Sequence, residues 1–475
     1  MRLRALPATA LAATALALLG SACGGRSTGS GLGARLLSVA DLPAGWSAVR
    51  ANPKDVQTSA PCLSSLPANS RGWTHETAAF VQGTSIPSLG EVVATGPQAR
   101  ARWRDLSRAL AGCRTAKITI AGKPATATVR PMSFPRVAGV TSAYAWAFTT
   151  AGLRIGFDLV LFEAGRDVGY VSYADLGPPA VATVKTFVDA AVAKAKTGST
   201  ARVSGAVSIA SAPVRTAQTT PGPVAYRSIG SGPPLVLIMG YGGTMEGWDR
   251  LFVDALARRY RVVAFDNAGV GGTRALPAPL TIDAMADQTG ALIDALGLKQ
   301  ANVLGWSMGS MIAQALAVLH PDQVRRLVLC ASFPGNGEAV RPSRAELDAF
   351  ESGDPQKVMA ALFPADQTSA QKTYLAALSS YPGAPSAPAD VTAAQGHAID
   401  DWWDGKDAAG ERAAEIAVPT LIADGTEDRL DPLTNSRNLA RLIRGAQLAL
   451  YPDAGHAFLF QERASFIPRI ESFLG

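Results

Sequence analysis

Gly-Trp-Ser-Met-Gly, residues 305–309, is the stretch that decides the fold of this 475-residue chain. The apolar residues 301–304 before it predict a buried strand, and the apolar pattern of residues 311–319 predicts a helix. Glycines on both sides of Ser307 permit the sharp turn that must join the two. The stretch therefore predicts a serine nucleophile, with the backbone N–H of Met308 directed at a developing oxyanion.

A serine hydroxyl needs a base to take its proton, and the chain has four histidines from which to choose. His456 follows the strand-like residues 447–451 in a loop, and it is the predicted base. His320 ends the helix after the serine, where a cation suits a helix C-terminus. His75 is expected on a surface or in a core, and His397 on a solvated face or in a pocket.

The acid that orients the base is expected between the serine and the histidine in the chain. Residues 419–423 predict a buried parallel strand, and Asp428 follows its carboxyl end, where ligand chemistry collects in parallel sheets. Asp431 is interpreted as the N-cap of the next helix, and Asp424 as a turn residue. Asp428 is the predicted acid, with Glu338 as the alternative.

These motifs, in this order, resemble the α/β-hydrolase fold family, in its group of esterases, lipases and cofactor-free haloperoxidases. Residues 224–234 resemble the second strand of that fold and its turn. Residues 235–243 resemble the third strand and the oxyanion loop, and residues 262–273 the fourth strand and its Gly-rich turn. The resemblance implies an α/β-hydrolase domain over residues 213–475.

The same resemblance implies that the backbone N–H of Tyr241 is the second donor of the oxyanion hole, beside Met308. Met239 stands where the family usually has a histidine, which separates the chain from subfamilies that use that side chain. Ser307 stands where dehalogenases and epoxide hydrolases of this fold have an aspartate. Those two reactions are therefore excluded.

Residues 335–415 resemble the lid that covers the active site in this fold. Trp306, Trp402 and Trp403 are expected to line the substrate pocket. Further apolar side chains of the lid line the pocket or pack the lid onto the core, namely Phe350, Met359, Leu362, Phe363 and Tyr374. The pocket is therefore expected to be apolar, which favours a carboxylic ester with an apolar acyl or alcohol part.

Three alternatives remain open at this stage. The same catalytic residues serve cofactor-free haloperoxidases or perhydrolases, and they serve hydrolases of C–C bonds. The third alternative is a surface lipoprotein that binds a ligand and catalyses nothing. Fold by itself does not decide between them.

The N-terminus predicts export. A basic start and the apolar residues 5–19 are typical of a signal peptide, and Cys23 follows small residues. Residues 1–23 resemble a bacterial lipoprotein signal, although Gly20 stands where an aliphatic residue is usual. The resemblance implies that Cys23 is lipidated and that residues 24–31 form a flexible tether. The expected location is the extracytoplasmic face of the cell membrane, or the medium if the chain is secreted.

Residues 32–196 predict a smaller α+β domain of unknown role, joined by a linker at residues 197–212. Its opening loosely resembles sensor-like extracytoplasmic lipoprotein domains of actinobacteria. Helices are expected at residues 97–110 and 179–195, and strands at residues 117–120, 143–149, 155–162 and 168–172.

Cysteines and charge limit the partners. Cys62 and Cys113 are predicted to form a disulfide, because an exported chain meets oxidising conditions, whereas Cys330 reads as a buried thiol. No Cys or His spacing indicates a metal, and no cofactor is predicted. The net charge of +6 comes from scattered residues without the basic run that tracks nucleic acid. The predicted partners are a small-molecule ester and, through a lipid anchor, the membrane.

Overall fold

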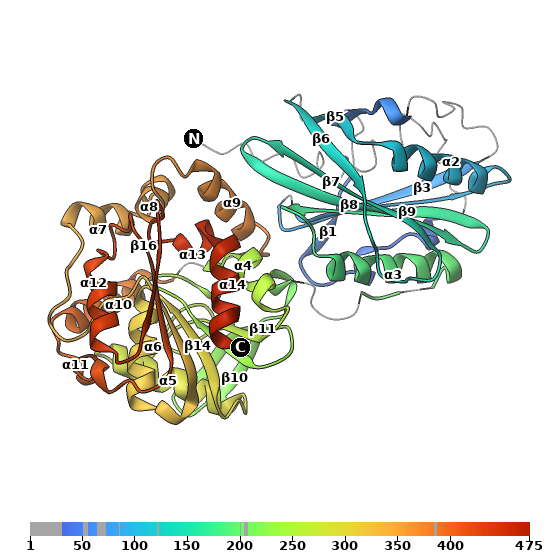
Figure 1. The fold of residues 1–475 in the computed structure, drawn as a ribbon. Coiled ribbons are helices and arrows are strands. Elements are labelled where there is room, and N and C mark those ends of the chain that lie inside the picture. Colours follow the sequence, from blue (N-terminus) through green and yellow to red (C-terminus); the bar gives the residue numbers. More distant parts are fainter. Residues whose placement is uncertain are drawn as a thin grey trace. The chain divides into compact units, whose positions relative to one another are not determined.

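A computed structural model describes residues 31–50, 56–63, 73–84, 86–120, 123–199, 201–203, 208–383 and 387–475 (Figure 1). The chain divides into two compact units, Met1–Ser211 with Leu375–Pro382, and Ala212–Tyr374 with Gly383–Gly475. The predicted signal peptide with Cys23, most of the tether and part of the linker lie outside the described residues. None of the described helices combines the length and the apolar character that crossing a bilayer requires.

The first unit is built on a nine-stranded sheet in the order β1-β3-β4-β9-β8-β7-β6-β5-β2, with antiparallel neighbours throughout. Helices α2 (Ala99–Gly112) and α3 (Val181–Thr197) cover opposite faces of this sheet (Figure 1). The predicted α+β class is confirmed. The strands are β1 (Trp46–Ala48), β2 (Val56–Ser59), β3 (Thr74–Gln82), β4 (Ser88–Thr95), β5 (Thr115–Ile120), β6 (Lys123–Pro131), β7 (Val140–Thr150), β8 (Leu153–Ala164) and β9 (Asp167–Leu176).

A disulfide joins Cys62 to Cys113, with Cα atoms 5.4 Å apart. Cys62 lies in the short helix Pro61–Leu63, and Cys113 follows the last residue of α2. The bond therefore ties an N-terminal segment to the end of a helix that packs on the sheet. Cross-links over separations of this kind, here 51 residues, stabilise a domain by about 2–4 kcal/mol.

The second unit is built on an eight-stranded sheet in the order β10-β11-β13-β12-β14-β15-β16-β17. The first three strands in that order pair in antiparallel fashion, and every later pair is parallel. This is the predicted α/β-hydrolase sheet. The strands are β10 (Arg215–Thr219), β11 (Gly222–Ile229), β12 (Pro234–Ile238), β13 (Arg261–Phe265), β14 (Ala301–Trp306), β15 (Val324–Cys330), β16 (Thr420–Gly425) and β17 (Gln447–Tyr451).

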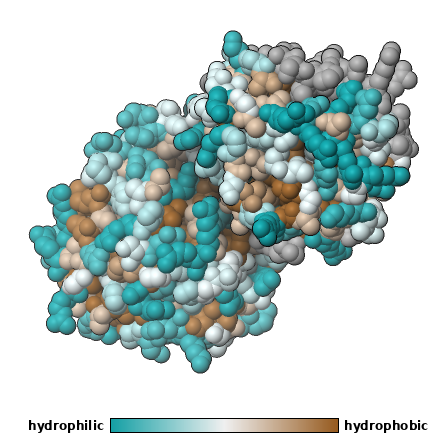
Figure 2. All heavy atoms as spheres, turned by 45° about the vertical axis from the view of Figure 1, so that its right-hand side comes forward, coloured by the Kyte–Doolittle hydropathy of each residue, from teal (hydrophilic) through white to brown (hydrophobic). Residues whose placement is uncertain are grey.

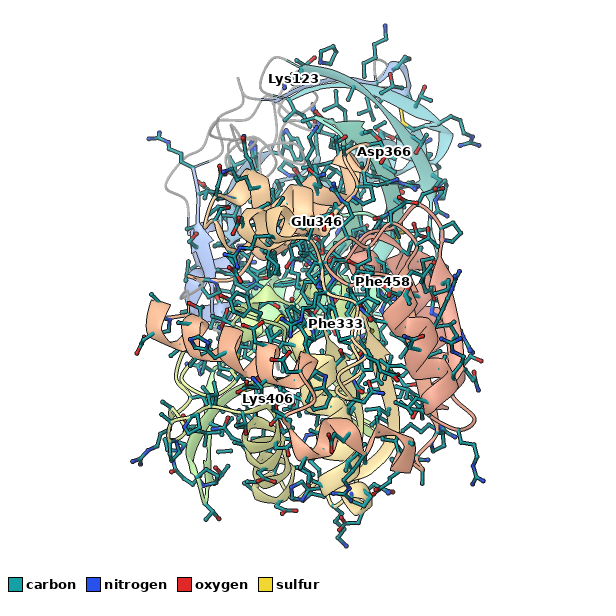
Figure 3. The ribbon with its side chains drawn as sticks, turned by 90° about the vertical axis from the view of Figure 1, so that its left-hand side faces the viewer. Lys123, Phe333, Glu346, Asp366, Lys406 and Phe458 are labelled. Carbon is teal, nitrogen blue, oxygen red and sulfur yellow. A yellow bond between two sulfur atoms is a disulfide. The ribbon has the colours of Figure 1, made fainter. Side chains whose placement is uncertain are left out.

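Two inner strands of this sheet, β14 and β16, are buried along their whole length. All six residues of β14 and all six of β16 are buried, because helices cover both faces of a parallel sheet. Figure 3 shows Phe333 and Phe458 among densely packed side chains, and both are less than 4% exposed. The helices of the sheet are α4 (Arg250–Leu256), α5 (Ile282–Ala295), α6 (Met308–Leu319), α12 (Thr434–Leu442), α13 (Phe458–Gln461) and α14 (Arg463–Leu474).

The predicted lid is helical. It comprises α7 (Arg344–Glu351), α8 (Pro355–Leu362), α9 (Thr368–Leu378), α10 (Ala389–Trp403) and α11 (Ala408–Glu411). The start of α7 has a capping box, in which Ser343 and Glu346 satisfy each other's backbone N–H groups.

Hydrophilic side chains cover most of the face seen in Figure 2, with hydrophobic ones in smaller separate areas.

Candidate active site

Ser307 occupies the turn between β14 and α6. Its backbone adopts φ 59° and ψ −125°, a strained conformation for a residue with a side chain. The Ser307 N–H donates to the carbonyl of Cys330 on the neighbouring strand at 2.9 Å, which fixes the turn to the sheet. The strain is the cost of presenting the hydroxyl at the carboxyl edge of the sheet.

The glycines beside Ser307 are required by space. A Cβ atom on Gly305 would collide with the carbonyl oxygen of Gly309, and one on Gly309 would collide with the carbonyl oxygen of Ile238. Neither glycine has a positive φ. The pattern around the serine therefore reflects the close approach of helix α6 to strands β12 and β14.

The predicted base and acid lie together. Nδ1 of His456, in the loop after β17, is 2.8 Å from Oδ2 of Asp428, in the loop after β16. Oδ1 of Asp428 accepts the backbone N–H groups of Leu430 at 2.9 Å and Asp431 at 2.8 Å. These bonds fix the carboxylate, which in turn holds the Nδ1–H tautomer of His456 and leaves Nε2 free to act on the serine.

The loop that carries His456 is also tied to the serine turn. The indole Nε1–H of Trp306 donates to the backbone carbonyl of His456 at 3.0 Å. The two rings lie 5.7 Å apart between centroids. Ser307 and His456 line one pocket, so the structure brings all three predicted catalytic residues to one edge of the sheet.

Asp428 belongs to a group of three buried carboxyls. Oxygens of Asp424, Asp428 and Asp431 lie within 4.8 Å of one another. Burial, and then the charge of the neighbouring carboxylates, raises the pKa of Asp424 and of Asp431 well above the usual range. The group has the oxygen ligands of a divalent cation, but the raised pKa values oppose binding, because carboxyl groups bind a cation in their deprotonated form.

The interpretations of Asp431 and Asp424 as a helix cap and a turn residue are wrong. Helix α12 begins at Thr434 with Leu433 at its N-cap. Asp431 instead accepts from Nδ2 of Asn435 at 2.9 Å and is fully buried. Asp424 is the next-to-last residue of strand β16 and accepts from the hydroxyl of Ser436 at 2.7 Å.

The predicted oxyanion loop follows β12 and lies against the serine turn. A Cβ atom on Gly240 would lie 3.1 Å from the carbonyl oxygen of Trp306 and 3.2 Å from the Cβ of Ser307, a tight approach that glycine eases. Tyr241, the next residue, lines the same pocket as Ser307. Met308 is the first residue of α6, where backbone N–H groups have no partner within the helix.

Two side chains that the sequence analysis did not identify hold this loop. Oε1 of Gln395, on lid helix α10, accepts the backbone N–H of Gly242 at 2.9 Å. Nδ2 of Asn267, after β13, donates to the carbonyl of Met239 at 2.8 Å. Gln395 is fully buried and Asn267 is 2% exposed. Asn267 lies in the predicted Gly-rich turn and Gln395 in no motif, and neither role could be predicted, because each side chain acts on a segment far away in the chain.

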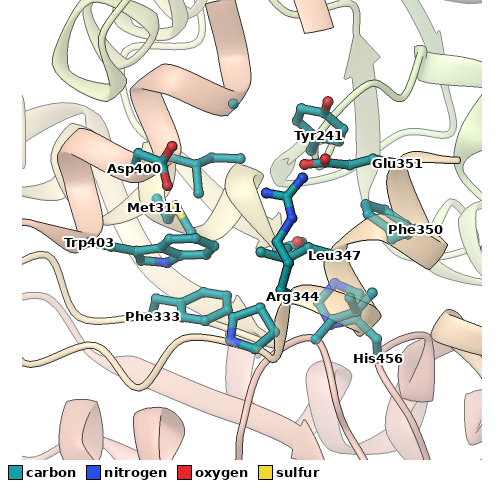
Figure 4. A pocket seen from close by; sticks show the side chains of 15 residues that line it. Tyr241, Met311, Phe333, Arg344, Leu347, Phe350, Glu351, Asp400, Trp403 and His456 are labelled. Carbon is teal, nitrogen blue, oxygen red and sulfur yellow. The ribbon is translucent and has the colours of Figure 1, made fainter. Parts of the chain in front are cut away.

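The pocket has a volume of about 100 Å³. Most of its wall comes from lid helices α7 and α10, and Figure 4 shows Arg344 extending into it between Trp403 and Phe350. The lining residues are Tyr241, Ser307, Met311, Phe333, Pro342, Arg344, Leu347, Phe350, Glu351, Gly396, Ile399, Asp400, Trp403, Leu430 and His456.

Of the three tryptophans expected in the pocket, only Trp403 lines it. Trp402 is fully buried on the other side of α10, and its Nε1–H donates to the carbonyl of Phe333. Adjacent residues of a helix point in directions about 100° apart, so the two tryptophans cannot share one wall. Trp306 packs against His456 and does not line the pocket. The expectations for Trp402 and Trp306 are therefore wrong.

The other candidates lie elsewhere. Glu338 is exposed and bonded to Asn336, and His397 is exposed on α10. His320 pairs with Asp287 at 2.8 Å. Among the lid aromatics, Phe350 lines the pocket, whereas Tyr374 is buried and stacks on Phe460 with ring centroids 4.9 Å apart.

Known proteins share this arrangement. A profile of the alpha/beta hydrolase fold family matches residues 233–463. The 2-hydroxymuconate semialdehyde hydrolase of Pseudomonas sp. (strain CF600) is 33% identical over 259 residues, which cover 52% of this chain and 88% of that protein. A protein of Mycobacterium tuberculosis (strain CDC 1551 / Oshkosh), provisionally named non-heme bromoperoxidase BpoC, is 30% identical over 255 residues, which cover 50% of this chain and 92% of that protein.

A solved structure, an alpha/beta hydrolase fold protein from Chitinophaga pinensis, superposes with a TM-score of 0.50 at 27% identity. The superposition covers 56% of this chain and 98% of the chain from Chitinophaga pinensis. The chain belongs to the alpha/beta hydrolase fold family. It is a member of an enzyme superfamily of hydrolases, and its relatives carry the names of different reactions.

Proposed function

We propose that the protein is a serine hydrolase that cleaves carboxylic esters with an apolar acyl or alcohol part. The observation that carries the proposal is a single pocket that exposes Ser307 and His456, with His456 held by Asp428 at 2.8 Å. Serine, histidine and aspartate in this arrangement are the groups that acyl transfer requires.

The mechanism follows from the contacts. His456 takes the proton of Ser307, whose Oγ attacks the ester carbonyl. The backbone N–H groups of Tyr241 and Met308 then stabilise the oxyanion, and one such donor is worth about 2.7–4 kcal/mol in an acyl-transfer enzyme. Asp428 stabilises the imidazolium that forms. His456 protonates the leaving alcohol and afterwards activates the water that hydrolyses the acyl-enzyme.

The wall of the pocket supports an apolar substrate part. Met311, Phe333, Leu347, Phe350 and Trp403 present apolar surface beside the serine. Burying such surface is worth about 25 cal/mol per Å² of substrate removed from water. The small volume of the pocket supports a short acyl chain rather than a long one.

The experiment is a series of p-nitrophenyl esters of increasing acyl length, assayed with wild type and with Ser307→Ala. Turnover that disappears in Ser307→Ala, with an optimum at short acyl chains, is the expected result. Asp428→Asn and His456→Ala should each remove most of the turnover. Wild-type turnover by His456→Ala, or ester turnover that survives in Ser307→Ala, would contradict the proposal.

The names of two relatives favour two other reactions at the same residues. The 33% identity to 2-hydroxymuconate semialdehyde hydrolase favours C–C bond hydrolysis, and the 30% identity to BpoC favours a perhydrolase or haloperoxidase reaction. Turnover of that semialdehyde, or halogenation that depends on peroxide, should therefore be measured beside the esters. A folded protein that turns over none of these substrates would favour the ligand-binding lipoprotein.

We also propose that the protein is exported and anchored by a lipid on Cys23. The disulfide between Cys62 and Cys113 supports export, because such bonds persist in oxidising compartments. Labelled palmitate should enter wild type and not Cys23→Ala, and the wild type should sediment with membranes. Equal labelling of both proteins, or none in either, would contradict the lipid anchor.

A further inference from the structure

A second pocket lies within the first unit, over the strands β6, β7 and β8. It encloses about 190 Å³ and shares no residue with the pocket of Ser307. Nothing in the hydrolase reaction uses it. Its lining residues are Thr128, Arg130, Ala145, Trp146, Ala147, Arg154, Ile155, Gly156, Asp158, Gly177, Pro178 and Pro179.

The register of the strands explains the floor of this pocket. Arg130 on β6 pairs with Ala145 on β7, which pairs with Asp158 on β8. Cross-strand partners point to the same face of a sheet, so Arg130 and Asp158 face one another across a methyl group. In the next row Ala147 pairs with Gly156. Small residues between the charged ones thus leave the space open.

The turn after β9 forms the roof. A Cβ atom on Gly156 would collide with the carbonyl oxygen of Gly177, so the roof rests directly on the floor at this point. The N–H of Gly177 donates to the carbonyl of Arg154 at 2.8 Å, which fixes the turn. Pro178 and Pro179 follow and have no N–H groups to offer a ligand. The roof is therefore rigid and largely apolar.

Asp158 is the unusual residue of the pocket. It is 3% exposed, and its Oδ2 is buried without a hydrogen-bond partner. Burial raises its pKa to about 7, and the charge of Arg130 lowers the pKa only in part. A buried carboxyl oxygen without a partner is costly, and it is retained in a fold where a ligand or a function compensates.

We propose that this pocket binds a small zwitterion, whose ammonium group pairs with Asp158 and whose anionic group pairs with Arg130 and Arg154. Both arginines are exposed at the rim, where a guanidinium can bind a carboxylate with two parallel hydrogen bonds. The first unit is then a ligand-binding module, and this role is independent of the reaction at Ser307.

The charges favour a zwitterion over simpler ligands. An anion without an ammonium group would leave Asp158 unpaired and would be repelled by a negative charge on that side chain. A cation without an anionic group would pair with Asp158 but would be repelled by the two guanidinium groups. Amino acids whose two charged ends are separated by a short carbon chain satisfy both ends of the pocket, and the apolar roof accommodates the chain.

The test is calorimetric titration of the full chain with glycine, β-alanine and γ-aminobutyrate. Ethylammonium and propionate serve as probes that carry only one of the two charges. The variants are Asp158→Asn, which keeps the shape of the side chain, and Arg130→Gln. Lys117→Gln is the matched control, because it removes an exposed charge from β5 outside the pocket. Circular dichroism melts verify that each variant folds.

One ω-amino acid should bind wild type with millimolar affinity or better, and more tightly than either singly charged probe. Asp158→Asn and Arg130→Gln should each weaken that binding by about tenfold or more, and Lys117→Gln should not. The proposal is overturned if no ω-amino acid binds, if propionate binds as tightly as the best of them, or if Asp158→Asn binds it like wild type. Ester turnover at Ser307 is measured in parallel and should not change in Asp158→Asn.

Discussion

Replacement of Gln395 by methionine should slow catalysis from a position outside the pocket. Gln395 is buried on lid helix α10, and its Oε1 accepts the N–H of Gly242, one residue beyond the oxyanion donor Tyr241. Methionine has a similar length and no acceptor. Gln395→Met therefore removes one bond between the lid and the oxyanion loop without opening a large cavity.

The magnitude follows from what the loop does. Loss of one neutral hydrogen bond lowers the free energy of unfolding by about 1 kcal/mol, which the fold tolerates. A donor displaced by about 1 Å from its productive position costs up to about 10²-fold in rate. We therefore expect kcat for the best p-nitrophenyl ester to fall between about tenfold and a hundredfold. KM should change little, because Gln395 does not line the pocket.

Steady-state kinetics of Gln395→Met and of His397→Ala give the comparison. His397 lies two residues further along the same helix and is exposed, so its substitution should leave both kinetic constants unchanged. Thermal melts separate a general loss of stability from the local effect. A Gln395→Met enzyme with the kcat of wild type would refute the argument that the lid holds the oxyanion loop.

Three further predictions concern the turn, the pocket and a buried acid. Gly309→Ala should abolish ester turnover and lower stability by about 1–3 kcal/mol in a thermal melt, because its Cβ meets Ile238, whereas Gly112→Ala, with open space around it, should be tolerated. Trp403→Leu should move the optimum of the ester series to longer acyl chains, and an unchanged optimum would remove Trp403 from the pocket wall. Burial raises the pKa of Glu91 to about 8, so the folded state keeps a proton that the unfolded state releases near pH 4.5, and stability is lost as the pH rises between these values. Glu91→Gln should therefore raise the melting temperature relative to wild type at pH 8.5 far more than at pH 4.5, and an equal difference at both would contradict this assignment.

The fold of the second unit could be predicted closely because its strands are short apolar runs that end in motifs. Strand β17 begins and ends at the predicted residues, and β14 extends two residues beyond the predicted run, up to the serine turn. Parallel strands that are buried on both faces have continuous apolar runs, which the sequence shows directly. The order of the motifs then assigned each strand its place in the sheet.

The first unit was less predictable. Strands β7, β8 and β9 were expected, but β3 and β4 were not, and all nine strands form one sheet. Strand β4, Ser88–Thr95, is buried on both faces and contains Gly90 and Glu91, so it lacks the alternation of apolar and polar residues on which the prediction relied. Pairing between distant strands supplies what the local pattern lacks.

In the candidate site, residues whose role belongs to a local motif could be assigned, and residues whose partner lies far along the chain could not. Ser307 and His456 stand in recognisable turns, whereas Gln395 and Asn267 act through hydrogen bonds that join segments more than 25 residues apart. The sequence also did not show which side of a lid helix faces the pocket and which faces the core. One position along α10 separates a residue of the pocket wall, Trp403, from a residue of the core, Trp402.

In the group formed by Asp424, Asp428 and Asp431, the contacts of each carboxyl decide which one orients the catalytic histidine. Burial, and then the charge of the neighbouring carboxylates, raises the pKa of two members, Asp424 and Asp431. Of the three, Asp428 is the one whose oxygens contact two backbone N–H groups and the imidazole together. Three residues of the same type thus differ in role: one orients the catalytic histidine, and two are buried beside it. The backbone N–H groups of the loop after β16 make this distinction, because the three side chains are of the same type.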